Sequence, residues 1–370
     1  MKRLLVALAA AASAAIGSTL NASAFTPQTT AATHAISWLH GQQTADGTVA
    51  GSASRTEDTV FGLVANGQAV DGFSTAGKTP IDSLRSHIAD EEKTAGNIGG
   101  LIMAVSAAGL DPTSFAAHNL LQDLQCTYNP QTGAYNTQLF NDALALLALP
   151  AGTAPVKAKD FLASQQQADG GWEFQAGFGS DTNTTALVLM ALHSTGALTD
   201  TARDRALAYF KVHQKPSGGF EYSTPYAPPG DSDPNSDAAV IQGLVAVGED
   251  PTGTVWTVDG KNAVADLLTF QFDNGGFGFS RPGSSQTAAP DALSTTQALV
   301  VLASKYLPVK ATTGVMPSTC PATAASPTPT PAPSGTPGTG QLAQTGSPPI
   351  AGLIGIVLIG LGWRLRRRAA

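Results

Sequence analysis

Apolar and polar stretches alternate along the middle of the chain. Stretches rich in Ala, Leu and Val would form helices that are apolar nearly all round, and they cover residues 58–64, 97–105, 142–149, 184–192, 237–245 and 294–302. A helix of this kind is buried on more than one side. The stretches before them, such as 156–165, mix apolar and charged residues at helical spacing and are expected to face solvent. The pattern predicts six buried helices surrounded by six amphipathic ones.

The turn from each amphipathic helix to the next buried helix carries a recurring phrase. Clear copies end at Phe174, Tyr222 and Phe279, and weaker copies contain Gly47 and Tyr135. Each clear copy places two glycines before an aromatic residue: Gly170, Gly171 and Trp172; Gly218, Gly219 and Phe220; Gly275, Gly276 and Phe277. Glycine permits the positive φ of a tight turn, and the aromatic rings are expected to pack between neighbouring hairpins. The connector at Gly109 recurs at Gly248, 139 residues later, which fits three repeat units of about 46 residues.

These phrases, Gln-x-x-x-Gly-Gly-(Trp/Phe)-x-(Phe/Tyr) followed by a capped Ala/Leu helix, resemble the repeats of squalene cyclases and protein prenyltransferase β subunits. The resemblance covers roughly residues 33–309 and implies an all-α fold, an α/α6 toroid of six helical hairpins with an inner and an outer ring. The toroid also resembles cobalamin-carrier and complement thioester domains. Because one fold serves unrelated functions, the resemblance indicates the fold better than the chemistry.

The first residues of the chain are typical of an export signal. Met1-Lys-Arg3 precedes an apolar run and the small residues Ala22-Ser-Ala24, so residues 1–24 are interpreted as a signal peptide and the mature chain is expected to begin at Phe25. The toroid is expected to occupy residues 25–315, and the Pro-, Thr- and Ser-rich residues 316–341 are interpreted as an extended stalk.

Residues 342–370 resemble a sortase sorting signal of the Leu-Ala-x-Thr-Gly type. The motif is Leu342, Ala343, Gln344, Thr345 and Gly346, followed by an apolar stretch and terminal arginines. The resemblance implies that Thr345 is joined to the peptidoglycan of a Gram-positive cell wall by a sortase, with membrane contact only through the unprocessed tail. A marginal membrane anchor is the alternative, although about 14 apolar residues are short for a spanning helix.

The net charge of the expected mature domain argues against nucleic acid as a partner, and the two cysteines raise the question of a disulfide. Of the 20 Lys and Arg, two lie in the signal and four in the tail, which leaves 14 between residues 25 and 345 against 27 Asp and Glu, a net charge of −13. So acidic a domain is not expected to bind nucleic acid. Cys126 and Cys320 are the two cysteines, and an exported chain allows them to pair as a disulfide or to remain separate thiols.

Three kinds of chemistry known in the resembling families were tested against the residues. Cyclases carry Asp-x-Asp-Asp, whose central aspartate protonates an alkene, and the nearest match here is Asp231-Ser-Asp-Pro234, with Asp233 as a weak candidate acid. Prenyltransferases need a zinc ion held by Asp, Cys and His, and Cys126 has no partners at the family's spacing. No Cys-Gly-Glu-Gln thioester motif occurs.

Carboxylates also gather at or just before the buried helices, at Asp58, Asp142, Asp181, Asp237 and Asp291, where most are expected to cap the helices. The segment Asp231, Asp233, Asn235 and Asp237 presents oxygens at alternate positions, like the first half of a calcium loop, but lacks the second half. Calcium is therefore one interpretation of the segment, and a solvated capping loop is the other. No other cofactor is expected.

The sequence thus favours a cell-wall-anchored surface protein whose toroid is a non-enzymatic recognition module for an unknown extracellular ligand. Two alternatives remain. One is an enzyme of the terpenoid cyclase or prenyltransferase kind. The other is a carrier of a small hydrophobic or corrinoid-like molecule.

Overall fold

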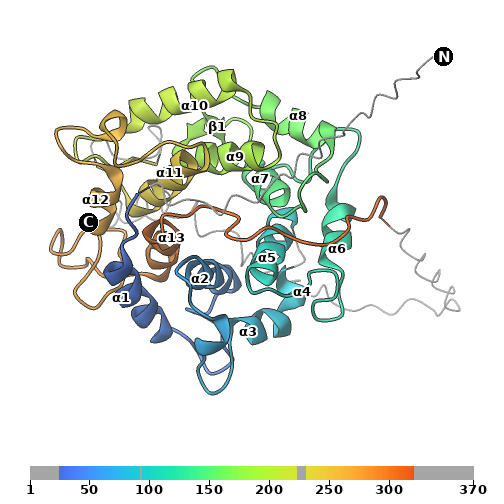
Figure 1. The fold of residues 1–370 in the computed structure, drawn as a ribbon, viewed down its shortest axis with the longest axis horizontal. Helices are drawn as coiled ribbons and strands as arrows, with labels where there is room; N and C mark the ends of the chain where they lie inside the picture. Colours follow the sequence, from blue (N-terminus) through green and yellow to red (C-terminus); the bar gives the residue numbers. More distant parts are fainter. Residues whose placement is uncertain (1–24, 92–93, 223–230, 321–370) are drawn as a thin grey trace, which may run out of the picture.

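The computed structural model describes residues 25–91, 94–222 and 231–320, and within them the chain forms a double ring of helices (Figure 1). The predicted signal peptide 1–24, the stalk beyond residue 320 and the sorting signal 342–370 lie outside the described residues. The inner ring of this part consists of α2 (Ala53–Ala65), α5 (Ala95–Ala107), α7 (Leu139–Leu147), α9 (Thr182–Ser194), α11 (Pro234–Ala246) and α13 (Ala292–Leu302).

The outer ring consists of α1 (Thr29–His40), α3 (Pro80–Ser86), α6 (Leu120–Thr127), α8 (Val156–Ser164), α10 (Asp200–His213) and α12 (Ala263–Leu268). Short additional elements are α4 (Ile88–Glu91), the 3-10 turns η1 (Val70–Gly72) and η2 (Thr254–Trp256), and the antiparallel pair β1 (Trp172–Glu173) and β2 (Ser180–Asp181). Consecutive inner helices pack against each other and α13 packs against α2, so the ring is closed. The predicted α/α toroid is confirmed for the described residues, none of whose helices is both long and apolar enough to cross a bilayer.

The two glycines of each pair have different roles, which the sequence did not distinguish. The first glycine carries the positive φ: 95° at Gly170, 91° at Gly218 and 95° at Gly275. The second glycine makes room instead, because a Cβ at Gly276 would lie 2.7 Å from the Trp38 ring. The aromatic residues that follow, Trp172, Phe220 and Phe277, are fully buried, as expected of rings packed between hairpins.

A glutamine in each phrase ties its turn to the next outer helix. The side-chain amide of Gln271 donates to the carbonyls of Gly275 and Ala31, both at 2.9 Å. Gln166 makes the equivalent bonds to Gly170 and to Ala202 of α10, and Gln214 makes them to Gly218 and to Trp256 of η2, which precedes α12. The Gln271 bonds join the last hairpin to the first helix, so these bonds contribute to ring closure.

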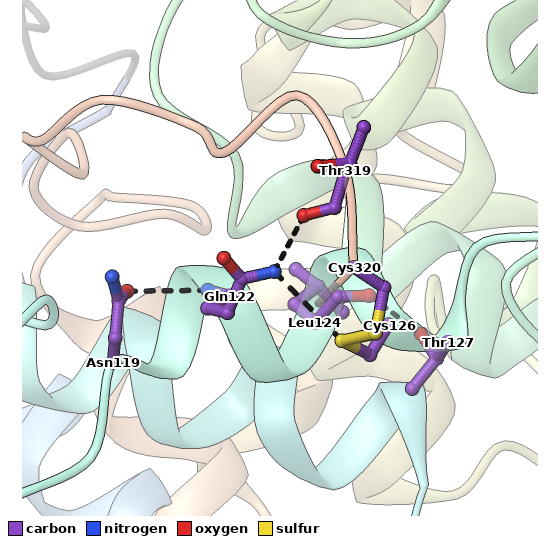
Figure 2. The surroundings of a disulfide bond; sticks show 7 residues. All are labelled: Asn119, Gln122, Leu124, Cys126, Thr127, Thr319 and Cys320. Atoms are coloured by element: carbon purple, nitrogen blue, oxygen red, sulfur yellow. Dashed lines mark hydrogen bonds between the residues drawn. A yellow bond between two sulfur atoms is a disulfide. The ribbon is translucent and has the colours of Figure 1, made fainter. Parts of the chain in front are cut away.

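After α13, residues 303–320 form a C-terminal segment that runs across the ring past the end of α5 to α6 (Figure 1). Its start is fixed where Phe25 N–H donates to Ser304 Oγ at 3.1 Å. Further along, Gly314 packs against Leu121. Cys126 and Cys320 then form a disulfide at the end of α6, beside the bond from Gln122 to the Thr319 carbonyl (Figure 2). The packed region therefore extends to Cys320, beyond the boundary at residue 315 expected from composition.

Candidate functional site

The inner helices run in one direction, because a single hairpin separates each from the next, and their N-terminal ends lie at one mouth of the ring. This end of the ring is called the N-terminal rim. The carboxylates noted in the sequence lie there, where the exposed N–H groups of the first helical turns favour negative charge. In the structure each of these carboxylates caps a helix, accepts a hydrogen bond from the preceding glycine turn, or forms an ion pair.

Three aspartates are N-caps. Asp181 accepts from Thr184 N–H at 2.7 Å. Asp291 accepts from Ser294 N–H at 2.8 Å. Asp233 accepts from the N–H groups of Asn235 and Ser236 at 3.0 and 2.9 Å. The expectation that Asp181 and Asp291 cap helices is therefore confirmed. Asp233, the candidate acid, caps α11 through the same kind of side-chain hydrogen bond.

Asp142 and Asp237 do not cap their helices, contrary to expectation. Each lies in the first turn of an inner helix and accepts a backbone N–H from the preceding glycine turn: Tyr135 N–H at 2.5 Å for Asp142 and Phe220 N–H at 2.6 Å for Asp237. Threonine does this at the equivalent positions, since Thr185 Oγ accepts from Trp172 and Thr295 Oγ from Phe277, both at 2.9 Å. Asp58 departs in another way, with its carboxylate 3.0 Å from the Arg55 guanidinium.

Asp181, like Asp142 and Asp237, is a rim carboxyl that can hold a transferable proton. Burial raises its pKa to about 7, against the opposing effect of its backbone hydrogen bonds. Its Oδ1 caps α9, whereas its Oδ2 makes no hydrogen bond of normal geometry within the described residues. Burial also raises the pKa of Asp233, but both oxygens of that carboxyl accept bonds, with Oδ2 taking the Ser236 hydroxyl at 2.7 Å.

Aromatic rings gather beside Asp181. Phe174, which follows the strand paired with Asp181, has its ring 6.0 Å from that of Phe140 and 6.4 Å from that of Phe178. Phe178 is 37% exposed, so this cluster reaches the surface. The face of an aromatic ring attracts a cation through its quadrupole. The backbone of Phe174 reaches Asp181, so the buried acid and the aromatic cluster come from adjacent segments at the rim.

The four candidate calcium ligands are directed to different partners. Asp231 pairs with Arg281 at 3.0 Å, and Asp233 caps α11. The Asn235 amide donates to Gln297 at 2.7 Å, and Asp237 holds the glycine turn. In the described stretches of the chain no three His, Cys, Asp or Glu side chains are grouped to hold a metal ion.

Sequence reasoning missed Asp266, which lies on α12 with its side chain 4% exposed and contacts Arg281 at 2.8 Å. No motif marks this residue. An alignment of the repeats could have identified it. In that alignment Asp266 occupies the position that Tyr209 and Trp38 have in the neighbouring units.

No protein-family model matches the chain. A drimenyl diphosphate synthase from Streptantibioticus cattleyicolor is 37% identical over 107 residues, which make up 28% of this chain and 20% of that enzyme. The matched stretch thus spans only a fifth of the relative's length.

Solved structures share the fold over a larger part of the chain. The type II terpene cyclase MstE from Scytonema superposes with a TM-score of 0.55 at 16% identity, covering 75% of this chain and 97% of that one. A variant of the same cyclase in complex with its substrate, geranylgeranyl dihydroxybenzoate, gives a TM-score of 0.52 at 15% identity, covering 75% of this chain and 97% of that one.

These comparisons overturn the interpretation of the toroid as a non-enzymatic recognition module. The sequence relative is a terpene synthase and the two structures described above are of a terpene cyclase, which favours the enzyme that the sequence offered only as an alternative. The incomplete Asp-x-Asp-Asp was given too much weight, since it is a single local motif. The described part of the chain has the α/α toroid fold of terpene cyclases.

Proposed function

We propose that the toroid is the catalytic domain of a cyclase that starts ring closure of an isoprenoid chain by protonating an alkene. The observation that carries the proposal is the buried carboxyl of Asp181, whose pKa of about 7 leaves it substantially protonated near neutral pH, beside the Phe174 cluster. The 37% identity to a drimenyl diphosphate synthase supports this class of reaction.

The chemistry requires only groups that the rim provides. The O–H bond of Asp181 breaks as a C–H bond forms at one alkene carbon, which leaves a carbocation at the other. The next double bond attacks the cation and closes a ring, and the final cation loses a proton to give an alkene. The rings of Phe140, Phe174 and Phe178 stabilise positive charge through their π faces. Positioned acids contribute about 10²–10⁴-fold to such steps.

The substrate we propose has an uncharged head. A diphosphate is normally held by several Arg or Lys side chains converging on one spot. Two cations near the glycine turns are already engaged by carboxylates, Arg281 by Asp231 and Asp266, and Lys215 by Glu221, and a third, Arg205, donates to Gln166 and Gln167. With acidic groups around the rim, a neutral polyprenyl lipid fits the electrostatics better than a prenyl diphosphate does.

We further propose that the enzyme acts outside the cytoplasm, attached to a Gram-positive cell wall through Thr345. The sequence motif at 342–346 supports this, and so does the Cys126–Cys320 disulfide, because disulfides persist mainly in oxidising compartments. Mass spectrometry of wall digests should find peptides that end at Thr345 joined to peptidoglycan. Release of the intact chain by detergent alone would point to a membrane anchor instead.

The test of the catalytic proposal is turnover by the full chain. Purified protein is incubated with squalene, a polyprenol and farnesyl diphosphate, and the products are identified by mass spectrometry. Asp181→Asn should lower the rate of cyclisation at least 100-fold. Asp291→Asn is the matched control, since Asp291 is an N-cap of the same geometry, and it should retain activity. Equal activity in wild type and Asp181→Asn would remove Asp181 as the acid.

A further inference from the structure

The repeat provides an internal comparison for every glycine turn. The first glycine of each turn packs against an outer helix, and the residue four positions further along that helix faces the second glycine, as Tyr209 does at Gly171 and Trp38 at Gly276. The inner-helix residue at the same turn is Thr185 or Thr295. The typical surroundings of a second glycine are therefore an aromatic ring and a threonine.

The fifth hairpin departs from this rule at both positions. Asp266 and Asp237 take the places of the aromatic residue and the threonine, and a Cβ on Gly219 would meet both of their carboxyl groups. Asp237 is fully buried and Asp266 is 4% exposed. Two other described turns each share half of the change. The Gly133 turn has Asp142 at the threonine position and Phe161 opposite it, and the Gly47 turn keeps Thr56 but has Ser83 in place of the aromatic residue.

The two carboxyls of this pair have different surroundings. The two oxygens of Asp266 accept from the Arg281 guanidinium at 2.8 and 3.0 Å, and the Ser232 hydroxyl also donates to this carboxyl. Arg281 is shared with Asp231. Asp237 receives the Phe220 N–H on Oδ1, and its Oδ2 has no hydrogen-bond partner of normal geometry in the described part of the chain.

Two adjacent buried carboxylates cannot both be ionised without a large electrostatic penalty. The groups that face Asp237 are Asp266 from α12 and Asp233 from α11, with Arg281 beyond Asp266. Burial first, and the negative charge of Asp266 second, raise the pKa of Asp237 well above its usual range. A second buried carboxyl at this position is unfavourable unless a proton is retained, because the two negative charges repel each other.

We propose that Asp237 and Asp266 hold one proton between them and that this pair returns a proton to the N-terminal rim after each turnover, through Asp233. The inference rests on the proposed function. Asp233 is the next carboxyl on α11. The Tyr222 N–H faces Asp233 and the Tyr222 carbonyl accepts from Thr182 at 3.0 Å, which places Asp233 beside the N-terminus of α9. The proton passes from Asp233 to the rim acid through water, because a peptide group does not carry protons. Asp237 and Asp266 are positioning residues in this scheme, since neither touches the reacting chain.

The protons balance over one cycle. An O–H bond of the pair breaks as an O–H bond forms on the rim carboxylate that protonated the alkene. The pair regains its proton from water on the side of Asp231, whose side chain is 75% exposed. The cyclic cation releases one proton to solvent when its alkene product forms, so no further reactant is needed.

The repeat also supplies the test. Asp237→Thr restores the residue of the neighbouring turns and still accepts the Phe220 N–H, so the melting temperature of the full chain at pH 8 should rise. In the same variant the cyclisation rate should fall at least 10-fold with KM unchanged. The plot of rate against pH should also lose one of its two sloping sides. Asp142→Thr is the matched control at the equivalent position, and it should leave the pH–rate profile unchanged.

Three other outcomes would overturn the proposal or the proposed function on which it rests. A lower melting temperature for Asp237→Thr across pH 5–8 would show that the pair is structural and would overturn the proposal. A raised melting temperature with an unchanged pH–rate profile would show a shared proton without a role in turnover, which also overturns it. If the wild type converts no isoprenoid at all, the proposed function fails, while the melting data still decide whether the proton is shared.

Discussion

Cys320 is joined to Cys126, 194 residues earlier in the chain, at the end of α6 (Figure 2). The bond fixes the C-terminal segment after that segment has crossed the ring from α13 (Figure 1). Its start is fixed at Ser304 by the first described residue, Phe25. The toroid is therefore tied at both ends of its described chain, in addition to the packing of α13 against α2.

Removal of this disulfide should destabilise the whole toroid. In the chain-entropy model a closed loop of this length contributes about 5 kcal/mol. The double variant Cys126→Ser/Cys320→Ser should show a lower melting temperature, and reductant should lower that of the wild type to the same value. An unchanged melting temperature on reduction would mean that packing of residues 303–320 alone holds the segment.

A substitution at the first glycine of a turn should cost more than one at an open glycine. Gly275 has a φ of 95°, and a Cβ there would collide with the carbonyl of His34. Gly275→Ala should lower the free energy of unfolding by about 1–3 kcal/mol or more. Gly72→Ala is the control, because Gly72 lies in open space without a positive φ. The comparison is made by urea denaturation.

The transition of Gly275→Ala should remain a single step, because this turn contacts helix α1 and each hairpin buries its apolar face only against its neighbours. A separate early transition of one hairpin, seen as two steps in circular dichroism, would contradict a closed cooperative ring.

The stability of the protein should fall as pH rises from about 4 to 8. Burial raises the pKa of Asp142 to about 6 and that of Asp181 to about 7. A carboxyl whose pKa is higher in the folded state binds its proton more tightly when folded, so its stabilising effect is complete below about pH 4 and is lost as pH passes through 6 and 7. Melting temperatures measured across this range should decline, and Asp142→Thr should reduce the decline. A melting temperature that rises steadily with pH would be inconsistent with protonated rim carboxyls.

The order and capping of the hairpins could be predicted from sequence because each signal is local. Apolar helices, a cap such as Asp291 and a glycine turn occur within a few residues of one another, and the repeat states them several times. The role of each glycine could not be predicted. The positive φ of Gly275 and the close contact of Gly276 with Trp38 depend on a helix more than 200 residues away.

The candidate site was only partly predictable for the same reason. The sequence predicted that both Asp181 and Asp237 cap helices, which is right for Asp181, but nothing near Asp237 in sequence shows that it faces Asp266. The pKa of a carboxyl depends on burial and on neighbouring charges, which are set by packing between hairpins. The choice of a non-enzymatic function was wrong because it relied on missing local motifs, the incomplete Asp-x-Asp-Asp and the absent zinc ligands among them, whereas the fold similarity extends over three quarters of the chain.

The most direct test of acid-initiated cyclisation is to run the reaction of the full chain in D₂O and to locate deuterium in the product. Protonation of an alkene by Asp181, whose carboxyl exchanges with solvent, should place one deuterium from the solvent at the carbon that begins the cyclisation, and Asp181→Asn should form little of this product. A cyclised product without deuterium at that carbon would show that the cation arises by loss of a leaving group. That result would contradict the account.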